Sequence, residues 1–112
     1  MKSNSIVACA AGALLAALHP HAVAAPDARS LRVESLASSC AACHGTAGHA
    51  IDGSAVPGLA GLPALALAEQ MRGFKSGSRT ATVMQQIARG YSDAQIDQLA
   101  AYFAAQPAGR PK

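Results

Sequence analysis

The feature that most constrains this 112-residue chain is the segment Cys40-Ala41-Ala42-Cys43-His44. Two cysteines three positions apart, followed at once by a histidine, form the C-x-x-C-H pattern by which c-type haem is attached. On one helical turn, both thiols can reach the two vinyl groups on adjacent edges of the macrocycle, and the histidine then lies under the iron. The motif therefore predicts one covalently bound haem c, held by Cys40 and Cys43, with His44 as the proximal iron ligand.

The composition agrees with a core built around a large cofactor. Hydrophobic residues make up 51% of the chain, but aromatic residues are only 4% and there is no Trp. Much of the apolar content is Ala, which buries little area per residue. Domains this small often need a disulfide, a metal or a similar staple, and the haem would provide that missing core.

Other uses of the two cysteines fit less well. A thioredoxin-type redox pair needs an alternating strand and helix setting, and the sequence has no convincing strand signal. A structural zinc site needs four ligands, and the candidates Cys40, Cys43, His44 and His49 crowd into ten residues. A structural disulfide between cysteines three apart would close a tiny loop and stabilise little.

The N-terminus is typical of an export signal. Lys2 precedes an uncharged apolar stretch over residues 6–18, and Ala22-Val23-Ala24 fits the small-x-small cleavage rule. We therefore expect a signal peptide over residues 1–24, cleaved near Ala24, and a haem domain over residues 25–112. An uncleaved N-terminal anchor is the alternative, although the apolar stretch is shorter than the roughly 20 residues of a membrane-spanning helix.

Cleavage would leave eight basic and six acidic residues, a net charge near +2. Two haem propionates would bring this charge close to zero, so nucleic acid is not an expected partner. No membrane span is expected in the mature protein. Export predicts a periplasmic location.

Apolar periodicity predicts an all-α fold of about four helices around one haem. The last helix has the clearest signals, because Ser92 and Gln95 form a capping box and Pro107 stops the helix. Glycines and prolines between residues 45 and 63 exclude a long regular element there. The expected helices cover residues 30–39, 64–76 and 79–88, and the segment from Ser92 to just before Pro107.

The second axial ligand is chosen from a short set of residues. Met84 lies 40 positions beyond His44 in a polar-flanked segment, so the chain can wrap the ring and approach the iron from the opposite face. Met71 shares an apolar helical stripe with Leu67 and Phe74, which is typical of packing. His49 is too close to His44 in sequence to reach the far face easily. Met84 is the favoured sixth ligand, with Met71, His49 or an open site as alternatives.

From residue 30 to residue 106 the chain resembles class I c-type cytochromes. The helix before the C-x-x-C-H motif matches, and His44 is followed by Gly45. The segment Val56-Pro57-Gly58-Leu59-Ala60-Gly61-Leu62-Pro63 resembles the family's Pro-x-Leu-x-Gly loop beside the haem. The resemblance implies that the Pro57 carbonyl accepts a hydrogen bond from the proximal histidine, which would fix the imidazole tautomer.

A narrower resemblance is to the cytochrome subunit of sulfide-oxidising flavocytochrome c. It is carried by Gly73-Phe74-Lys75-Ser76-Gly77 and by the segment Thr82-Val83-Met84-Gln85-Gln86-Ile87-Ala88-Arg89-Gly90-Tyr91-Ser92. Those subunits often carry two haems, whereas this chain has a single C-x-x-C-H motif. The resemblance implies a flavoprotein dehydrogenase as electron donor.

These features favour an electron carrier that is not itself an enzyme, cycling Fe(II)/Fe(III) with both axial positions occupied. Arg72, Lys75 and Arg79 could form a positive rim that docks an acidic redox partner. One alternative is a fixed cytochrome subunit of a flavocytochrome c sulfide dehydrogenase-type complex. The other is a gas sensor or peroxidase-like haem protein with an open sixth position.

Overall fold

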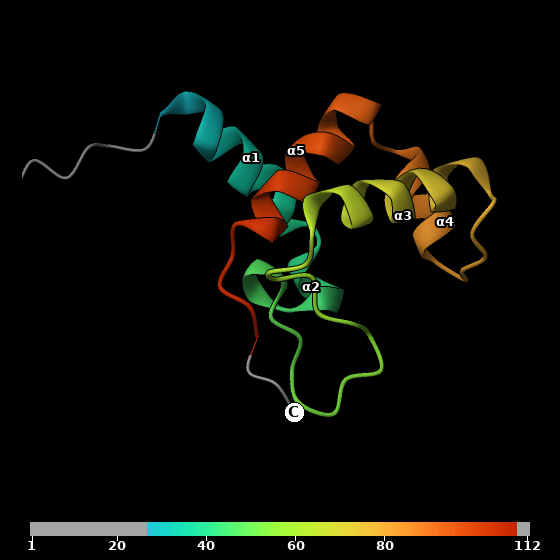
Figure 1. The fold of residues 1–112 in the computed structure, drawn as a ribbon, viewed down its shortest axis with the longest axis horizontal. Helices are drawn as coiled ribbons and strands as arrows, with labels where there is room; N and C mark the ends of the chain where they lie inside the picture. Colours follow the sequence, from blue (N-terminus) through green and yellow to red (C-terminus); the bar gives the residue numbers. More distant parts are fainter. Residues whose placement is uncertain (1–26, 110–112) are drawn as a thin grey trace, which may run out of the picture.

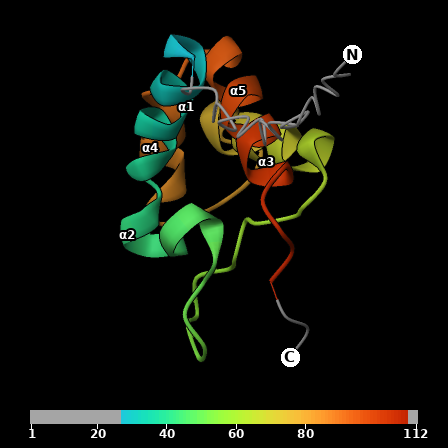
Figure 2. The same ribbon diagram turned by 90° about the vertical axis from the view of Figure 1, so that its left-hand side faces the viewer.

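The computed structural model describes residues 27–109, so the expected signal peptide lies outside the described residues. Within this range the chain forms helices and no strand, as the all-α prediction requires (Figures 1 and 2). In the described part, no helix is long and apolar enough to cross a membrane. The elements in chain order are α1 (Ala28–Ser38), α2 (Ala41–His44), the 3-10 turn η1 (Thr46–Gly48), α3 (Ala64–Ser76), α4 (Met84–Arg89) and α5 (Asp93–Ala104).

The first helix begins two residues earlier than the apolar pattern predicts. The Asp27 carboxylate caps it by accepting hydrogen bonds from the backbone N–H groups of Arg29 and Ser30, at 2.9 and 2.7 Å. An acidic side chain is also favourable beside the positive end of the helix dipole. The apolar periodicity starts only at Leu31 and gives no sign of this cap.

The core lies where α1, α3 and α5 meet (Figure 1). Of the eight buried apolar residues in the described part of the chain, four are alanines. The side chains therefore bury little area for a domain of this size. The cluster that joins the three helices consists of Ala37, Leu67, Ala68, Ile96, Leu99, Ala100 and Phe103.

The two long helices in the C-terminal half end close to where the sequence indicates. In α5 the Ser92 hydroxyl accepts a hydrogen bond from the Gln95 N–H, and the Gln95 side chain accepts one from the Ser92 N–H. This reciprocal pair is the predicted capping box. Helix α3 ends at Gly77, whose left-handed φ of 83° stops the helix at little steric cost.

The prediction of a helix over residues 79–88 is wrong in its first half, because α4 begins only at Met84. Residues 79–83 form bends and irregular backbone instead. Thr80, Thr82 and Val83 are β-branched and weaken helix formation. The Arg79 N–H also donates to the Gly73 carbonyl at 3.0 Å, which turns the chain back onto α3. Tertiary contacts therefore override the apolar periodicity of this segment.

The segment after α2 is tied to the C-terminal helix by backbone hydrogen bonds. Leu59 N–H donates to the Gly48 carbonyl at 2.8 Å, and Gly61 N–H donates to the Phe103 carbonyl at 2.9 Å. Gly45 starts this segment with a φ of 82° and a ψ of 161°, a combination open in practice only to glycine. A Cβ atom built on Gly45 would lie 1.8 Å from the His49 carbonyl oxygen.

We expect Gly45→Ala to destabilise the folded protein by more than about 3 kcal/mol, because backbone strain and the clash with His49 add together. Gly77→Ala is the matched control, since Gly77 also has a positive φ but an added Cβ would meet nothing within 4 Å. Its cost should be only about 1–2 kcal/mol. Denaturant unfolding of both variants measures the difference, and equal costs would contradict the steric argument.

Candidate functional site

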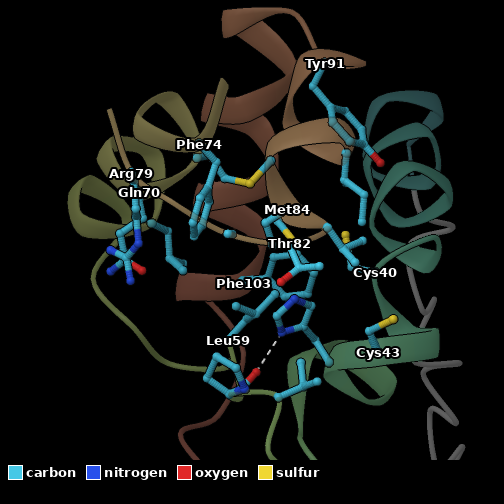
Figure 3. A pocket seen from close by; sticks show the side chains of 18 of the residues that line it. Cys40, Cys43, Leu59, Gln70, Phe74, Arg79, Thr82, Met84, Tyr91 and Phe103 are labelled. Carbon is cyan, nitrogen blue, oxygen red and sulfur yellow. Dashed lines mark hydrogen bonds between the residues drawn. The ribbon is translucent and has the colours of Figure 1, made fainter. Parts of the chain in front are cut away.

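An apolar cavity of about 620 Å³ opens in the middle of the fold (Figure 3). Its size lies within the range of about 300–1,000 Å³ typical of small-molecule and cofactor sites. The end of α1, α2, the loop before Leu59, α3, the bend before α4, α4 and α5 all contribute to its wall. Both cysteines and the histidine of the C-x-x-C-H motif line it, together with Met71 and Met84.

His44 is the only buried polar or charged residue in the described part of the chain, with 8% of its surface exposed. It ends α2, and its Nδ1 donates a hydrogen bond to the Pro57 carbonyl oxygen at 2.7 Å. A carbonyl can only accept, so the proton must sit on Nδ1 and the lone pair on Nε2. The imidazole is thus held in the tautomer that binds a metal through Nε2.

Cys40 and Cys43 flank the first residues of α2 and line the same end of the cavity (Figure 3). Neither forms a disulfide. Cys40 is half-buried, and this burial raises the pKa of its thiol. The neighbouring Ser39 side chain lowers that pKa by a smaller amount. Cys43 is exposed. Both sulfur atoms are therefore free to form bonds to a group held in the cavity.

The structure brings two of the three candidates for a second axial ligand to the cavity wall. Met84 is the first residue of α4, and Met71 lies in the middle of α3 and also packs against the core cluster. His49 is exposed and lies outside the cavity wall.

One contact at the cavity was missed by the sequence analysis. The Ser39 hydroxyl donates its only proton to the Leu36 carbonyl at 2.9 Å. In its 2.9 Å hydrogen bond with the Tyr91 hydroxyl, Ser39 is therefore the acceptor and Tyr91 the donor. This bond joins the end of α1 to the turn before α5, next to Cys40. The only sequence signal was a tyrosine directly before the Ser92 cap, and nothing in the pattern indicates its distant partner.

The expected positive rim is largely neutralised. Arg72 pairs with Asp97 at 2.6 Å, and Lys75 pairs with Asp93 at 2.7 Å, so both cations of α3 face carboxylates of α5. The hydrogen bond from Lys75 and its charge lower the pKa of Asp93. Only Arg79 of the proposed trio makes no ion pair within residues 27–109.

Two rival uses of the cysteines gain no support from the described residues. In that part of the chain, no group of three or more His, Cys, Asp or Glu residues is placed to hold a metal ion between them. The strand that a thioredoxin-type motif follows is also missing from residues 27–109.

A helical domain that surrounds an apolar cavity with a C-x-x-C-H segment at its edge is a class I c-type cytochrome. The cytochrome c family profile matches residues 32–106, and the chain belongs to the cytochrome c family. It is an electron-transfer protein with one covalently bound haem c. The cavity fits this group, because apolar side chains form most of its wall and the wall contains two thiols, a histidine and methionine sulfur.

Curated relatives are similar over much of the described domain. A thiosulfate dehydrogenase electron acceptor from Thiomonas intermedia is 43% identical over 76 residues, which is 67% of this chain. A cytochrome subunit of sulfide dehydrogenase from Chlorobaculum tepidum is 42% identical over 72 residues, or 64% of this chain. Cytochrome c-554(548) from Halomonas halodenitrificans is 35% identical over 71 residues, or 61% of this chain.

The matched segment covers different shares of these relatives. It spans 35% of the first protein's length, 64% of the second and 84% of the third. The chain thus spans about a third of the first relative's length and less than two thirds of the second's. Their activities and partners belong to those proteins.

The bond between Tyr91 and Ser39 should stabilise the fold measurably. We expect Tyr91→Phe to lower the free energy of unfolding by about 1 kcal/mol, a typical net value for one hydrogen bond. Ser39→Ala should cost a similar amount, and the double variant little more than either single one. Denaturant unfolding of the holoprotein provides this double-mutant cycle, and fully additive costs would show that the two hydroxyls do not interact.

Proposed function

We propose that this protein is a periplasmic single-electron carrier whose haem iron is ligated by His44 and Met84. The observation that carries the proposal is the hydrogen bond from His44 Nδ1 to the Pro57 carbonyl, at 2.7 Å. It leaves Nε2 as the ligating atom and prevents the ring from turning. Met84 lines the same cavity from α4, whereas His44 belongs to α2, so the two ligands would approach the iron from different helices.

In this proposal each cysteine forms one thioether. The S–H of Cys40 or Cys43 would add across a vinyl double bond of the haem, forming a carbon–sulfur bond and placing the proton on the neighbouring vinyl carbon. No electrons are gained or lost in this addition. Helix α2 holds the two sulfur atoms at one end of the cavity, and the Pro57 carbonyl fixes the imidazole between them and the loop.

The choice of Met84 over Met71 follows from how the two residues are supported. Met71 lies in mid-helix and packs against the core cluster, which is the usual place of a filler methionine. Met84 begins the short helix α4 after the irregular segment 79–83. The backbone at Met84 can therefore shift to bring the sulfur to the iron with little change in the core. A neutral, soft thioether favours the ferrous state and raises the reduction potential.

If His44 and Met84 both bind the iron, they would leave no open position for a substrate. Haem supplies the Fe(II)/Fe(III) couple, and the protein supplies the ligands, the apolar surroundings and the exclusion of water. This arrangement favours an electron carrier over an enzyme, a gas sensor or a peroxidase-like protein.

A second candidate function is a cytochrome subunit that accepts electrons from a sulfide-oxidising flavoprotein. The similarity to the cytochrome subunit of sulfide dehydrogenase favours it, and the similarity to the thiosulfate dehydrogenase electron acceptor favours a donor of the same general class. In this case the catalysis belongs to the dehydrogenase. Stable copurification with a flavoprotein from native periplasm would distinguish this candidate from a free carrier.

Met84→Leu should abolish the methionine–iron charge-transfer band of the ferric protein and lower the reduction potential, because the iron loses its sulfur ligand. The variant should still fold, at a cost of about 1.5 kcal/mol or less, since Leu conserves the volume. Met71→Leu is the matched control and should leave the band and the potential unchanged. The opposite pattern would move the axial ligand to Met71.

The same samples test the attachment. Acid–acetone extraction should leave the haem on the polypeptide in the wild-type protein and in both methionine variants. Haem that washes out, together with two titratable thiols, would contradict the central proposal.

We also propose that residues 1–24 are a signal peptide and that residues 25–112 form the mature domain. The apolar stretch followed by Ala22-Val23-Ala24 supports this division. N-terminal sequencing of the mature protein should begin at Ala25 or within two residues of it. A protein that still starts at Met1 and accumulates in the cytoplasm would contradict both the export and the periplasmic location.

A further inference from the structure

The cavity is chemically different at its two ends. Figure 3 shows Cys40 and Cys43 at one end, and Arg79 and Gln70 at the other. Among the described residues, no lysine, aspartate or glutamate lines the cavity, and Arg79 is the one permanently charged residue that does. A single cation at the end opposite the thiols calls for an anionic group there.

Arg79 is held in place from three sides. Its N–H donates to the Gly73 carbonyl at 3.0 Å, and its own carbonyl accepts from the Gln85 side chain at 3.2 Å. The guanidinium carbon lies 4.9 Å from the centre of the Phe74 ring, which is a cation–π contact. The two hydrogen bonds thus fix the backbone at Arg79, and the cation–π contact orients its side chain.

Gly73 makes this position possible. A Cβ atom added to Gly73 would lie 3.2 Å from the Cβ of Arg79, which is tighter than ordinary packing. A side chain at position 73 would crowd Arg79, so glycine there helps the bend after α3 to bring Arg79 back against the helix. The charge is placed by the fold and not merely by its position in the sequence.

The haem has a matching polarity. Its vinyl groups and its two propionates lie on opposite sides of the macrocycle, so thioethers at one end of the cavity direct the propionates to the other. We propose that Arg79 binds the haem propionates through its guanidinium, with the Gln70 amide as a neighbouring hydrogen-bond donor. This inference rests on the proposed attachment through Cys40 and Cys43.

A guanidinium beside the propionates would also affect the redox function. Two carboxylates favour the more positive ferric state, and Arg79, which is exposed but lines the apolar cavity, would offset part of their charge. Arg79 is therefore a positioning and tuning residue, which orients the haem and keeps the reduction potential higher than it would otherwise be. An ion pair to an Asp or Glu, as Arg72 and Lys75 have, would cancel this effect.

The test compares Arg79→Gln with Arg89→Gln in the purified holoprotein. Arg89 is an exposed arginine at the end of α4 that lies outside the cavity wall, so its removal gives the same change in net charge. We expect the midpoint potential to fall in the Arg79 variant and to change little in the Arg89 variant. Arg79→Lys should recover most of the fall, because it restores the charge. The propionate-bending band in resonance Raman spectra should shift only in the Arg79 variants.

Two results would overturn the inference. Equal potentials and unchanged Raman bands in Arg79→Gln and Arg89→Gln would mean that Arg79 acts only as a general surface charge. An unchanged potential with slower, less salt-sensitive electron transfer to an acidic partner would make Arg79 a docking residue instead. Absorption spectra and acid–acetone extraction of the same samples report haem attachment and axial ligation, so failure of the proposed function can be recognised separately.

Discussion

The burial of one large apolar group between α2, α3, α4 and α5 is the constraint on which the rest of the structure depends. The side chains alone form a small core in which alanine is half of the buried apolar set within residues 27–109. Small side chains let the helices approach one another on one side and leave an apolar cavity of about 620 Å³ on the other. The fold is therefore a frame for a cofactor, and the covalent attachment motif lies at the edge of that frame.

The hydrogen bond between His44 and the Pro57 carbonyl joins the attachment motif to the irregular loop. It uses a backbone acceptor, so the bond depends on the path of the loop more than on the side chain at position 57. That path is fixed by the backbone bonds of Leu59 to Gly48 and of Gly61 to Phe103. Helix α5 thus helps to hold the loop that orients the imidazole, although α5 is far from the motif in sequence.

The positively charged residues of α3 and of the bend after it have different roles. Arg72 and Lys75 hold α3 to α5 through exposed ion pairs, which contribute little stability individually. These two cations are no longer free to attract an acidic partner. Arg79, five residues before Met84, lies instead at the cavity. Of the three cations that the sequence suggested as a docking rim, Arg72 and Lys75 thus have a structural role, and Arg79 lies at the haem cavity.

The sequence by itself determined the cofactor, because C-x-x-C-H encodes haem attachment in five adjacent residues, and its apolar periodicity predicted the all-α class. It also determined α3 and α5, whose glycine and serine caps act locally. Only the tertiary structure decided where α4 begins, which cations are paired and that Tyr91 meets Ser39. These features depend on contacts between residues far apart in the chain, such as the 52 positions between Ser39 and Tyr91. Periodicity and capping rules describe neighbours within a few residues, so they carry no information about such contacts.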